Sequence, residues 1–509
     1  MTRYALVLVF AACTPPATGG GQVPAWVSDT SSYGPTTAPA APTLAPAASL
    51  VEPYRDDIAK ILAAARADRG AYQKLAELTD TIGARLAGSP ELERAIVWAA
   101  AAMTADGHLV RTEKVMVPHW KRGFEDAQLI APVARKLSVL GLGGSISTPK
   151  GGITAPVVVV QSFDELDARA AELKGAIVLY DVAMRPYDKE KGSDYGTVVK
   201  YRSAGASRAA KHGAVAVLVR SATERSLRTP HTGAMTYADD APKIPAAAIT
   251  LEDSSLIARL AAKGPVRVKL DLQSKTLPDA PSANVIGELR GKDKPEEVVL
   301  LGAHLDSWDV GQGAHDDGAG CVQMMQAITL LKKLGLQPRR TIRVVLFTNE
   351  ENGLRGAKAY AVEHARELGN HVFALEADAG GFAPGALGVG HKTAADRVAA
   401  RVGEIAQQVA STGLTKVFAT DHVGADISPL LAGGVPSAGL YTDGARYFDY
   451  HHTDADTLDK IDPVELNAGL GAIAVLAYVL ADLPDRIDLD AVPPSGGPGR
   501  PGTAGTSDR

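Results

Sequence analysis

Several features that define other classes of protein are scarce in this sequence. Only two cysteines occur among 509 residues, so no disulfide framework holds the fold together. Aromatic residues make up 5% of the chain, which leaves few platforms for stacking. An excess of one charge is also missing, because 53 basic side chains accompany 58 acidic ones and the net charge is -5. That balance gives no reason to expect nucleic acid or an acidic membrane surface as the main partner.

What is present is the composition of a large globular protein. Hydrophobic residues account for 46% of the chain and charged residues for 22%, which is ordinary for a folded protein and excludes a disordered one. At roughly 100–200 residues per domain, the chain has room for about three units. The 51 glycines indicate many tight turns.

The first residues resemble an export signal. A basic residue precedes an apolar run from Tyr4 to Ala12, which is too short to span a bilayer because that takes about 20 residues. Small residues followed by Cys13 resemble a bacterial lipobox, in which Cys13 is cleaved free and acylated. A plain export signal is the alternative. We therefore expect an exported protein, either lipid-anchored through Cys13 on the extracytoplasmic side of the membrane or secreted.

The body of the chain shows two patterns. After Pro281, apolar strands alternate with helical segments, a pattern that specifies a mostly parallel sheet covered by helices. Between residues 123 and 277, short apolar runs separated by turn residues predict a small β-rich domain with its own core. The predicted fold class is α/β, a mostly parallel mixed sheet sandwiched by helices with a β-rich insert. The predicted organisation is a signal peptide (1–12), a disordered tether (13–50), an α/β domain in two parts (51–122 and 278–485), the insert (123–277) and a disordered tail (486–509).

The elements of the α/β domain have clear signals at their ends. Strand Val298–Ala303 is unbroken and apolar, as expected for a strand buried on both faces. The last helix has Asp462 as N-cap and runs to Ala481, with Glu465 placed to complete a capping box. The remaining predicted strands are Thr341–Thr348, His371–Ala377 and Ser437–Tyr441.

Side chains that bind metal follow successive strands of this domain. Ligands of parallel sheets gather at the carboxyl ends of the strands, so these side chains are expected to meet. Each piece alone is a weak signal, but five of them in chain order are a strong one. The pieces are His304-Leu305-Asp306, His315-Asp316-Asp317, Glu350-Glu351, Glu376-Ala377-Asp378 and His451-His452.

Two of these pieces suggest how the chemistry is divided. Asp306 lies two residues after His304, on the same side of the strand end, and can accept a hydrogen bond from the imidazole nitrogen that does not bind metal. The adjacent Glu350 and Glu351 point in different directions, so one can bind metal while the other faces a water molecule as a base.

The pattern resembles the co-catalytic dizinc exopeptidases, and within them the branch of plasma glutamate carboxypeptidase, or carboxypeptidase Q. The similarity lies in the run His304–Gly313, in Asp316-Asp317-Gly318, in Glu350-Glu351 and in Tyr450-His451-His452. It covers roughly residues 51–485. The resemblance implies that the insert is a protease-associated domain, that a non-proline cis bond joins Asp316 to Asp317, and that the protein can form a homodimer.

The resemblance also implies a role for each residue. His304 and Asp378 would hold one zinc ion, Glu351 and His452 the other, and Asp316 would bridge them, giving two Zn²⁺ per chain. Glu350 would be the general base. Nitrogen and oxygen ligands without thiolate suit zinc or a neighbouring divalent ion. Two metals roughly 3.5–4 Å apart can share a hydroxide and polarise the scissile carbonyl together.

Three further residues have open interpretations. His451 adjoins a proposed ligand and is expected to face away from the metal, where it can donate to the tetrahedral oxyanion. His231 in the insert either reaches over the cleft toward the substrate or stabilises a turn. Asp456, four residues after His452, either orients that imidazole or has a capping or surface role.

Three functions compete on this sequence. The first is a dizinc exopeptidase that acts on dipeptides or short peptides, with the choice between aminopeptidase and carboxypeptidase left open. The second is an amidohydrolase of the acetylornithine deacetylase type, against which the short spacing from His304 to Asp316 and the position of the insert argue. The third is a catalytically inactive receptor-like or binding protein of the same fold, a class that loses ligands, whereas all six positions are filled here. Side-chain preference depends on the insert and on loops such as 417–426 and 443–450.

Overall fold

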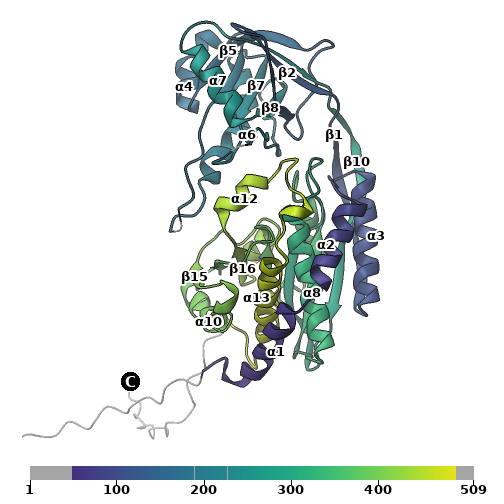
Figure 1. Ribbon diagram of the computed structural model, residues 1–509. Helices are drawn as coiled ribbons and strands as arrows, with labels where there is room; N and C mark the ends of the chain where they lie inside the picture. The colour runs from purple at the N-terminus through teal and green to yellow at the C-terminus, as the bar shows by residue number, and fades with distance from the viewer. Residues whose placement is uncertain (1–48, 189, 226, 489–509) are drawn as a thin grey trace, which may run out of the picture. The chain divides into compact units, whose positions relative to one another are not determined.

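A mixed sheet of eight strands forms the centre of the α/β domain (Figure 1). The computed structural model describes residues 49–188, 190–225 and 227–488. Four neighbouring strands, β12, β11, β13 and β16, run parallel, and antiparallel pairs flank them on both sides. In their order across the sheet the strands are β1 (Leu109–Lys121), β10 (Lys275–Leu289), β12 (Arg340–Phe347), β11 (Lys294–His304), β13 (His371–Ala377), β16 (Ser437–Tyr441), β14 (Ala386–Gly390) and β15 (Lys416–Ala419).

Helices bury both faces of this sheet. In β11, Val299 and Leu301 pack into the larger core, whereas Leu300 packs into the smaller core on the other face. A strand whose alternate side chains are both buried reads as an unbroken apolar run, as the sequence predicted. The helices of this part are α1 (Arg55–Arg66), α2 (Gly70–Thr81), α3 (Pro90–Ala105), α8 (Ala319–Lys333), α9 (Arg355–Glu363), α10 (Ala395–Gln407), α11 (Ser428–Ala432), α12 (Gly444–Tyr450) and α13 (Pro463–Asp482).

The predicted start of α13 is right, but the predicted capping box is wrong. The Asp462 side chain accepts a hydrogen bond from the backbone N–H of Val464 at 2.8 Å, as an N-cap residue does. The side chain of Glu465 does not accept the backbone N–H of Asp462, because its carboxylate forms an ion pair with Arg446 at 2.8 Å. A charged partner on a neighbouring element therefore replaces the local hydrogen bond.

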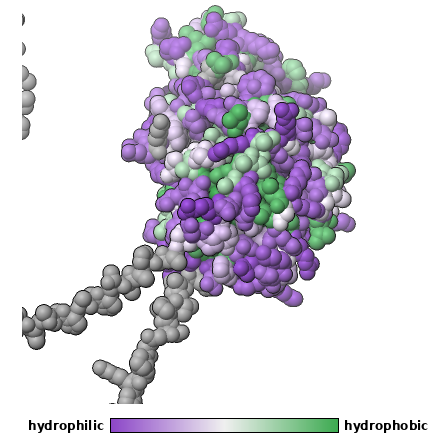
Figure 2. Space-filling model, turned by 60° about the horizontal axis from the view of Figure 1, so that its bottom comes forward, coloured by the Kyte–Doolittle hydropathy of each residue, from purple (hydrophilic) through white to green (hydrophobic). Residues whose placement is uncertain are grey.

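α13 is also an apolar helix of notable length. Among the described residues it is the one helix that could cross a membrane by length and composition, yet 83% of its most apolar stretch is buried. It packs against α1 and α8, which makes it a core helix of the domain. Polar and charged residues cover most of the surface visible in Figure 2, and apolar residues occupy smaller areas between them.

A second sheet of eight strands lies between β1 and β10 in the sequence. We call residues 123–277 the insert. Strands β5 to β8 run parallel, and the others run antiparallel to their neighbours. In order across the sheet its strands are β3 (Arg135–Leu137), β2 (Glu125–Ala131), β9 (Arg267–Leu272), β5 (Ile153–Val160), β6 (Ile177–Tyr180), β7 (Ala216–Arg220), β8 (Ala246–Ile249) and β4 (Val139–Gly141). Its helices are α4 (Phe163–Ala168), α5 (Ala170–Leu173), α6 (Tyr195–Lys211) and α7 (Leu251–Ala261).

The predicted α/β fold with a mixed sheet flanked by helices is confirmed, and three local expectations are wrong. The segment 443–450, expected to be a loop, is helix α12 from Gly444 onward. The insert is less β-dominated than the predicted β-rich domain, because its helix α6 has 17 residues. The predicted loop 417–426 begins inside strand β15. The exact domain boundaries and the assignment of the insert to protease-associated domains stay predictions.

Candidate metal centre

Three neighbouring strands deliver side chains to one edge of the central sheet. β11 ends at His304, and its parallel neighbours β12 and β13 end at Phe347 and Ala377. The carboxyl ends of parallel neighbours lie at the same edge. The residues that follow them, Glu350, Glu351 and Asp378, are therefore brought to His304.

Two loops complete the group. The segment Ala314–Gly318 between β11 and α8 carries Asp316, and the turn after α12 carries His451 and His452. The peptide bond between Asp316 and Asp317 is cis, as the resemblance implied.

The carboxylate of Asp316 lies between two imidazoles. Its Oδ1 is 3.2 Å from Nε2 of His304, and its Oδ2 is 3.2 Å from Nε2 of His452. Each imidazole nitrogen also faces a second carboxylate, Asp378 at 3.5 Å from His304 and Glu351 at 3.1 Å from His452. We call His304, Asp316 and Asp378 the first cluster, and Asp316, Glu351 and His452 the second cluster. The carboxylate of Asp316 thus belongs to both clusters and contributes one oxygen to each.

Several of these facing atoms are buried without a hydrogen-bond partner. They are Nε2 of His304, Oδ2 of Asp316, Oε1 of Glu351 and Oδ1 of Asp378. Buried polar atoms are normally satisfied, and each exception calls for an explanation such as an ion. The first cluster forms a group that could hold a metal ion, and so do Asp316, His451 and His452.

The charges of the site also favour a cation. Burial raises the pKa of the Glu351 carboxyl to about 7, and the negative charge of Asp316 adds to that effect. Burial would lower the pKa of His304, but the charge of Asp378 and the adjacent carboxylate of Asp316 raise it well above its usual range. Carboxylates crowded in a buried space are stable as anions only when positive charge accompanies them. A metal ion in each cluster would supply that charge.

Asp306 does not play the part that the sequence suggested. Nδ1 of His304 is 3.0 Å from the backbone carbonyl of Asp306 and 3.8 Å from its carboxylate, so the predicted carboxylate–histidine hydrogen bond is wrong. The carboxylate instead accepts the backbone N–H groups of Glu350 and Glu351 at 3.0 and 3.3 Å. The Asp306 side chain thus points toward the two N–H groups that follow strand β12, and its backbone carbonyl orients the imidazole of His304.

This contact makes Asp306 a positioning residue for the glutamate pair. We expect Asp306→Asn to lower kcat by about 10–100-fold, because the amide nitrogen cannot accept the second N–H and the base shifts. Steady-state kinetics together with metal content measures this. An unchanged kcat would show that the Glu350 backbone is held without Asp306.

The loop that carries Asp316 is held by two residues whose role the sequence did not reveal. Asp456 accepts the backbone N–H groups of His315 and Asp316 at 2.7 and 3.1 Å, so it orients this loop and not the His452 imidazole. The fully buried Arg85 donates to the carbonyls of Gln312 and Gly313 at 2.8 and 2.9 Å. Contacts to backbone atoms leave no pattern in a sequence, so no motif could have indicated that either residue holds this loop.

The remaining site candidates have the following positions. Nε2 of His451 is 3.8 Å from Asp316, and its ring stacks on that of His452 with centroids 3.5 Å apart, so it faces the second cluster more directly than expected. His231 is buried in the insert, where its backbone N–H donates to Ser221 at 2.8 Å. A substrate contact for His231 and an oxyanion contact for His451 stay predictions. Cys13 lies outside the described residues.

Comparisons with known proteins agree with this geometry. Residues 284–476 match the model of peptidase family M28. The chain is 43% identical to carboxypeptidase Q of Mus musculus over 82% of this chain and 86% of that protein. It is 42% identical to carboxypeptidase Q of Homo sapiens over 85% of this chain and 90% of that protein. The chain belongs to peptidase family M28.

One solved structure supports the M28 assignment, and a second shares the fold. The crystal structure of an M28 peptidase precursor from Shewanella amazonensis is similar with a TM-score of 0.81 and 38% identity, over 87% of this chain and 100% of that one. An aminopeptidase from Aneurinibacillus sp. strain AM-1 shares the fold at a TM-score of 0.60 and 22% identity, over 86% of this chain and 98% of that one. This M28 protein is thus a carboxypeptidase Q-like metallopeptidase with histidine and aspartate groups suited to a co-catalytic metal site.

Proposed function

We propose that this M28 protein is an exported dizinc exopeptidase that hydrolyses dipeptides or short peptides. The observation that carries the proposal is Asp316, whose two carboxylate oxygens each lie 3.2 Å from a different imidazole. A bridging carboxylate of this kind is what a pair of closely spaced divalent ions requires.

The donor set fits two zinc ions. His304 and Asp378 would hold one ion, Glu351 and His452 the other, and Asp316 would bridge them. Nitrogen and oxygen donors without thiolate suit zinc in a catalytic site, where a coordination position stays open. When bound, such a pair of ions supplies Lewis acidity to the scissile carbonyl and lowers the pKa of water.

Glu350 is the residue that moves the proton. Its backbone is fixed by Asp306, and burial raises the pKa of its carboxyl well above the usual range, with the charges of Glu351 and Asp378 adding to the effect. A carboxylate beside the metal centre can take a proton from the attacking water and return it to the leaving amine.

The proposed localisation of the protein is inferred from its first residues. The apolar run before Cys13 supports export, followed either by lipid attachment at Cys13 or by release as a secreted protein. Peptide substrates follow from the family, whereas the lipid anchor and a homodimer rest on the sequence and the resemblance.

A dipeptide library incubated with the zinc-loaded full chain tests the proposed activity. We expect hydrolysis of dipeptides with free ends. Matched substrates with an acetylated amino end or an amidated carboxyl end then show which end is recognised, and mass spectrometry identifies the products. A protein that binds two zinc ions and leaves every substrate intact would overturn the proposal.

A further inference from the structure

A loop of the insert forms a reciprocal pair of hydrogen bonds with His452. The backbone N–H of Thr232 donates to the carbonyl of His452 at 3.0 Å, and Nδ1 of His452 lies 3.1 Å from the carbonyl of Thr232. Both residues are buried. The insert therefore contacts the side chain and the backbone of a proposed ligand at once.

The hydrogen bond to Nδ1 determines which nitrogen of His452 is free for a metal. Nε2 faces Asp316 and Glu351 at 3.2 and 3.1 Å, so it is the nitrogen of the second cluster. A neutral imidazole that binds metal through Nε2 carries its proton on Nδ1, and that proton needs an acceptor. Arg202 lies 3.5 Å from Nδ1, but a guanidinium cannot accept a hydrogen bond. The acceptor is thus the carbonyl of Thr232.

The backbone of His452 also needs support from its surroundings. Its φ is +61°, in the left-handed region that side chains other than glycine adopt at a cost. The hydrogen bond from Thr232 to the His452 carbonyl is one of the contacts that hold this conformation. The same loop therefore fixes the turn and the ring of the ligand.

Arg122 ties the Thr232 loop to the peptidase side. Its guanidinium donates to the hydroxyl of Thr232 at 3.3 Å and to the carbonyl of Gly141 at 2.7 Å, and the Thr232 hydroxyl itself donates to Gly141 at 2.8 Å. Two further hydrogen bonds of 3.0 and 2.8 Å join Arg122 to the carboxylate of Asp309, in the loop that follows β11. Only 12% of the Arg122 side chain is exposed, and buried two-fold pairs of this kind are stronger than surface ion pairs.

We infer that the insert contributes to metal binding at the second cluster. Thr232 orients His452 for metal binding, and Arg122 and Asp309 hold Thr232 in place. The inference rests on the proposed two-metal function and adds a regulation to it, because zinc affinity at the second cluster depends on the docking of the insert. The first cluster does not share this dependence, since His304 is oriented by the carbonyl of Asp306 within the peptidase part.

Zinc titration of the metal-free full chain, with a chelating indicator in competition, tests the inference. Thr232→Val removes the hydroxyl with little change in volume and is expected to weaken binding of one zinc ion by about 10–100-fold while the other binds as before. Thr232→Ser keeps the hydroxyl and is expected to restore the wild-type affinity. Asp309→Asn breaks the same network from the peptidase side and is expected to match Thr232→Val.

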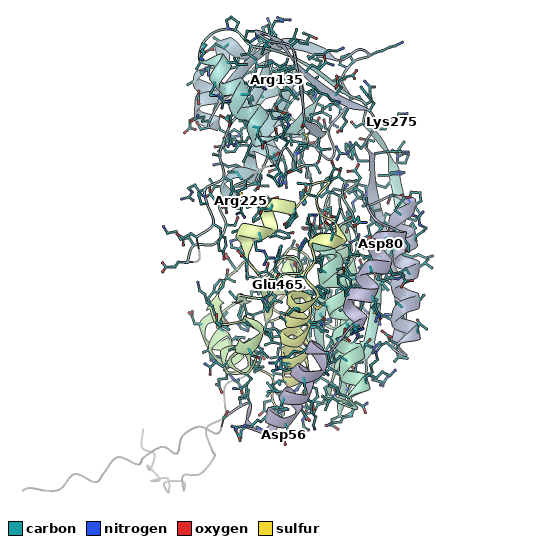
Figure 3. All side chains as sticks on the ribbon, viewed as in Figure 1. Asp56, Asp80, Arg135, Arg225, Lys275 and Glu465 are labelled. Atoms are coloured by element: carbon teal, nitrogen blue, oxygen red, sulfur yellow. The ribbon has the colours of Figure 1, made fainter. Side chains whose placement is uncertain are left out.

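Arg225→Gln is the matched control. Arg225, which is labelled in Figure 3, also joins the insert to the peptidase part through an exposed ion pair with Asp449 at 2.8 Å. Among the described contacts it makes no hydrogen bond to His452. Its loss is expected to leave both zinc affinities unchanged. Circular dichroism on each variant confirms that it is folded.

The outcomes separate the two proposals. Two zinc ions in the wild type, with both affinities retained in folded Thr232→Val and Asp309→Asn, overturn the inference alone. Equal weakening of both ions, or the same weakening in Arg225→Gln, also overturns it, because the insert would then act on the whole site. A wild type that binds fewer than two ions overturns the two-metal function together with this inference.

Discussion

Replacing Glu350 by glutamine is expected to lower kcat by about 10²–10⁴-fold while both zinc ions remain bound. Glutamine keeps the shape of the side chain but cannot accept a proton from water. Since Glu350 is not one of the residues that face His304 or His452 directly, the metal content is expected to stay at two ions. Steady-state kinetics on a cleaved dipeptide and metal analysis of the same sample measure both quantities.

Glu363→Gln is a suitable control for this variant. Glu363 is an exposed residue at the end of α9, and the same chemical change there is expected to leave kcat unaltered. If Glu350→Gln retained the wild-type kcat with both ions bound, another group would have to be the base. A loss of metal together with activity would instead assign Glu350 to the ligands.

Asp316→Asn is expected to abolish activity and to weaken the binding of both zinc ions. Residues that only orient a ligand typically contribute 10–100-fold in affinity, so a ligand shared by two ions is expected to contribute at least about 100-fold at each. The amide keeps the volume of the side chain and leaves the backbone contact from Asp316 to Asp456 in place. Zinc titration and dipeptide hydrolysis measure the effect.

The control for this change is Asp454→Asn, which alters an exposed aspartate two residues after His452 and is expected to change neither quantity. Should Asp316→Asn keep one ion at wild-type affinity, the carboxylate would belong to a single cluster. The bridging arrangement would then have to be abandoned.

The elements that carry the ligands could be predicted because their signals are local. Strands His371–Ala377 and Ser437–Tyr441 have the predicted bounds, since each is a short, largely apolar segment between polar or turn residues. The parallel order of the neighbouring strands then brings their ends together. The residues proposed for each cluster are therefore those that a sequence can indicate.

Other features could not be predicted because distant packing decides them. Helix α6 contains Gly205, which lowers helix propensity, but a Cβ at this position would lie 2.6 Å from the ring of Tyr180. Close packing of α6 against β6 thus requires a glycine at this position. The same glycine lowers the helix propensity of the segment, so the sequence did not predict a long helix there. The contacts of Thr232 with His452 and of Asp456 with Asp316 involve backbone atoms, and any residue type has those.

The pairing of β1 with β10 affects the order in which the chain acquires its structure. In this antiparallel pair Lys121 is opposite Lys275, so the chain leaves the sheet and returns to it at neighbouring points about 5 Å apart. The insert starts and ends there, and its own strands are all complete by Leu272. During synthesis from the amino end, β1 is made early and cannot pair with β10 until the intervening segment has been synthesised. All strands of the insert are available for pairing before β10 is. The peptidase sheet can therefore be completed only after the whole insert has been synthesised.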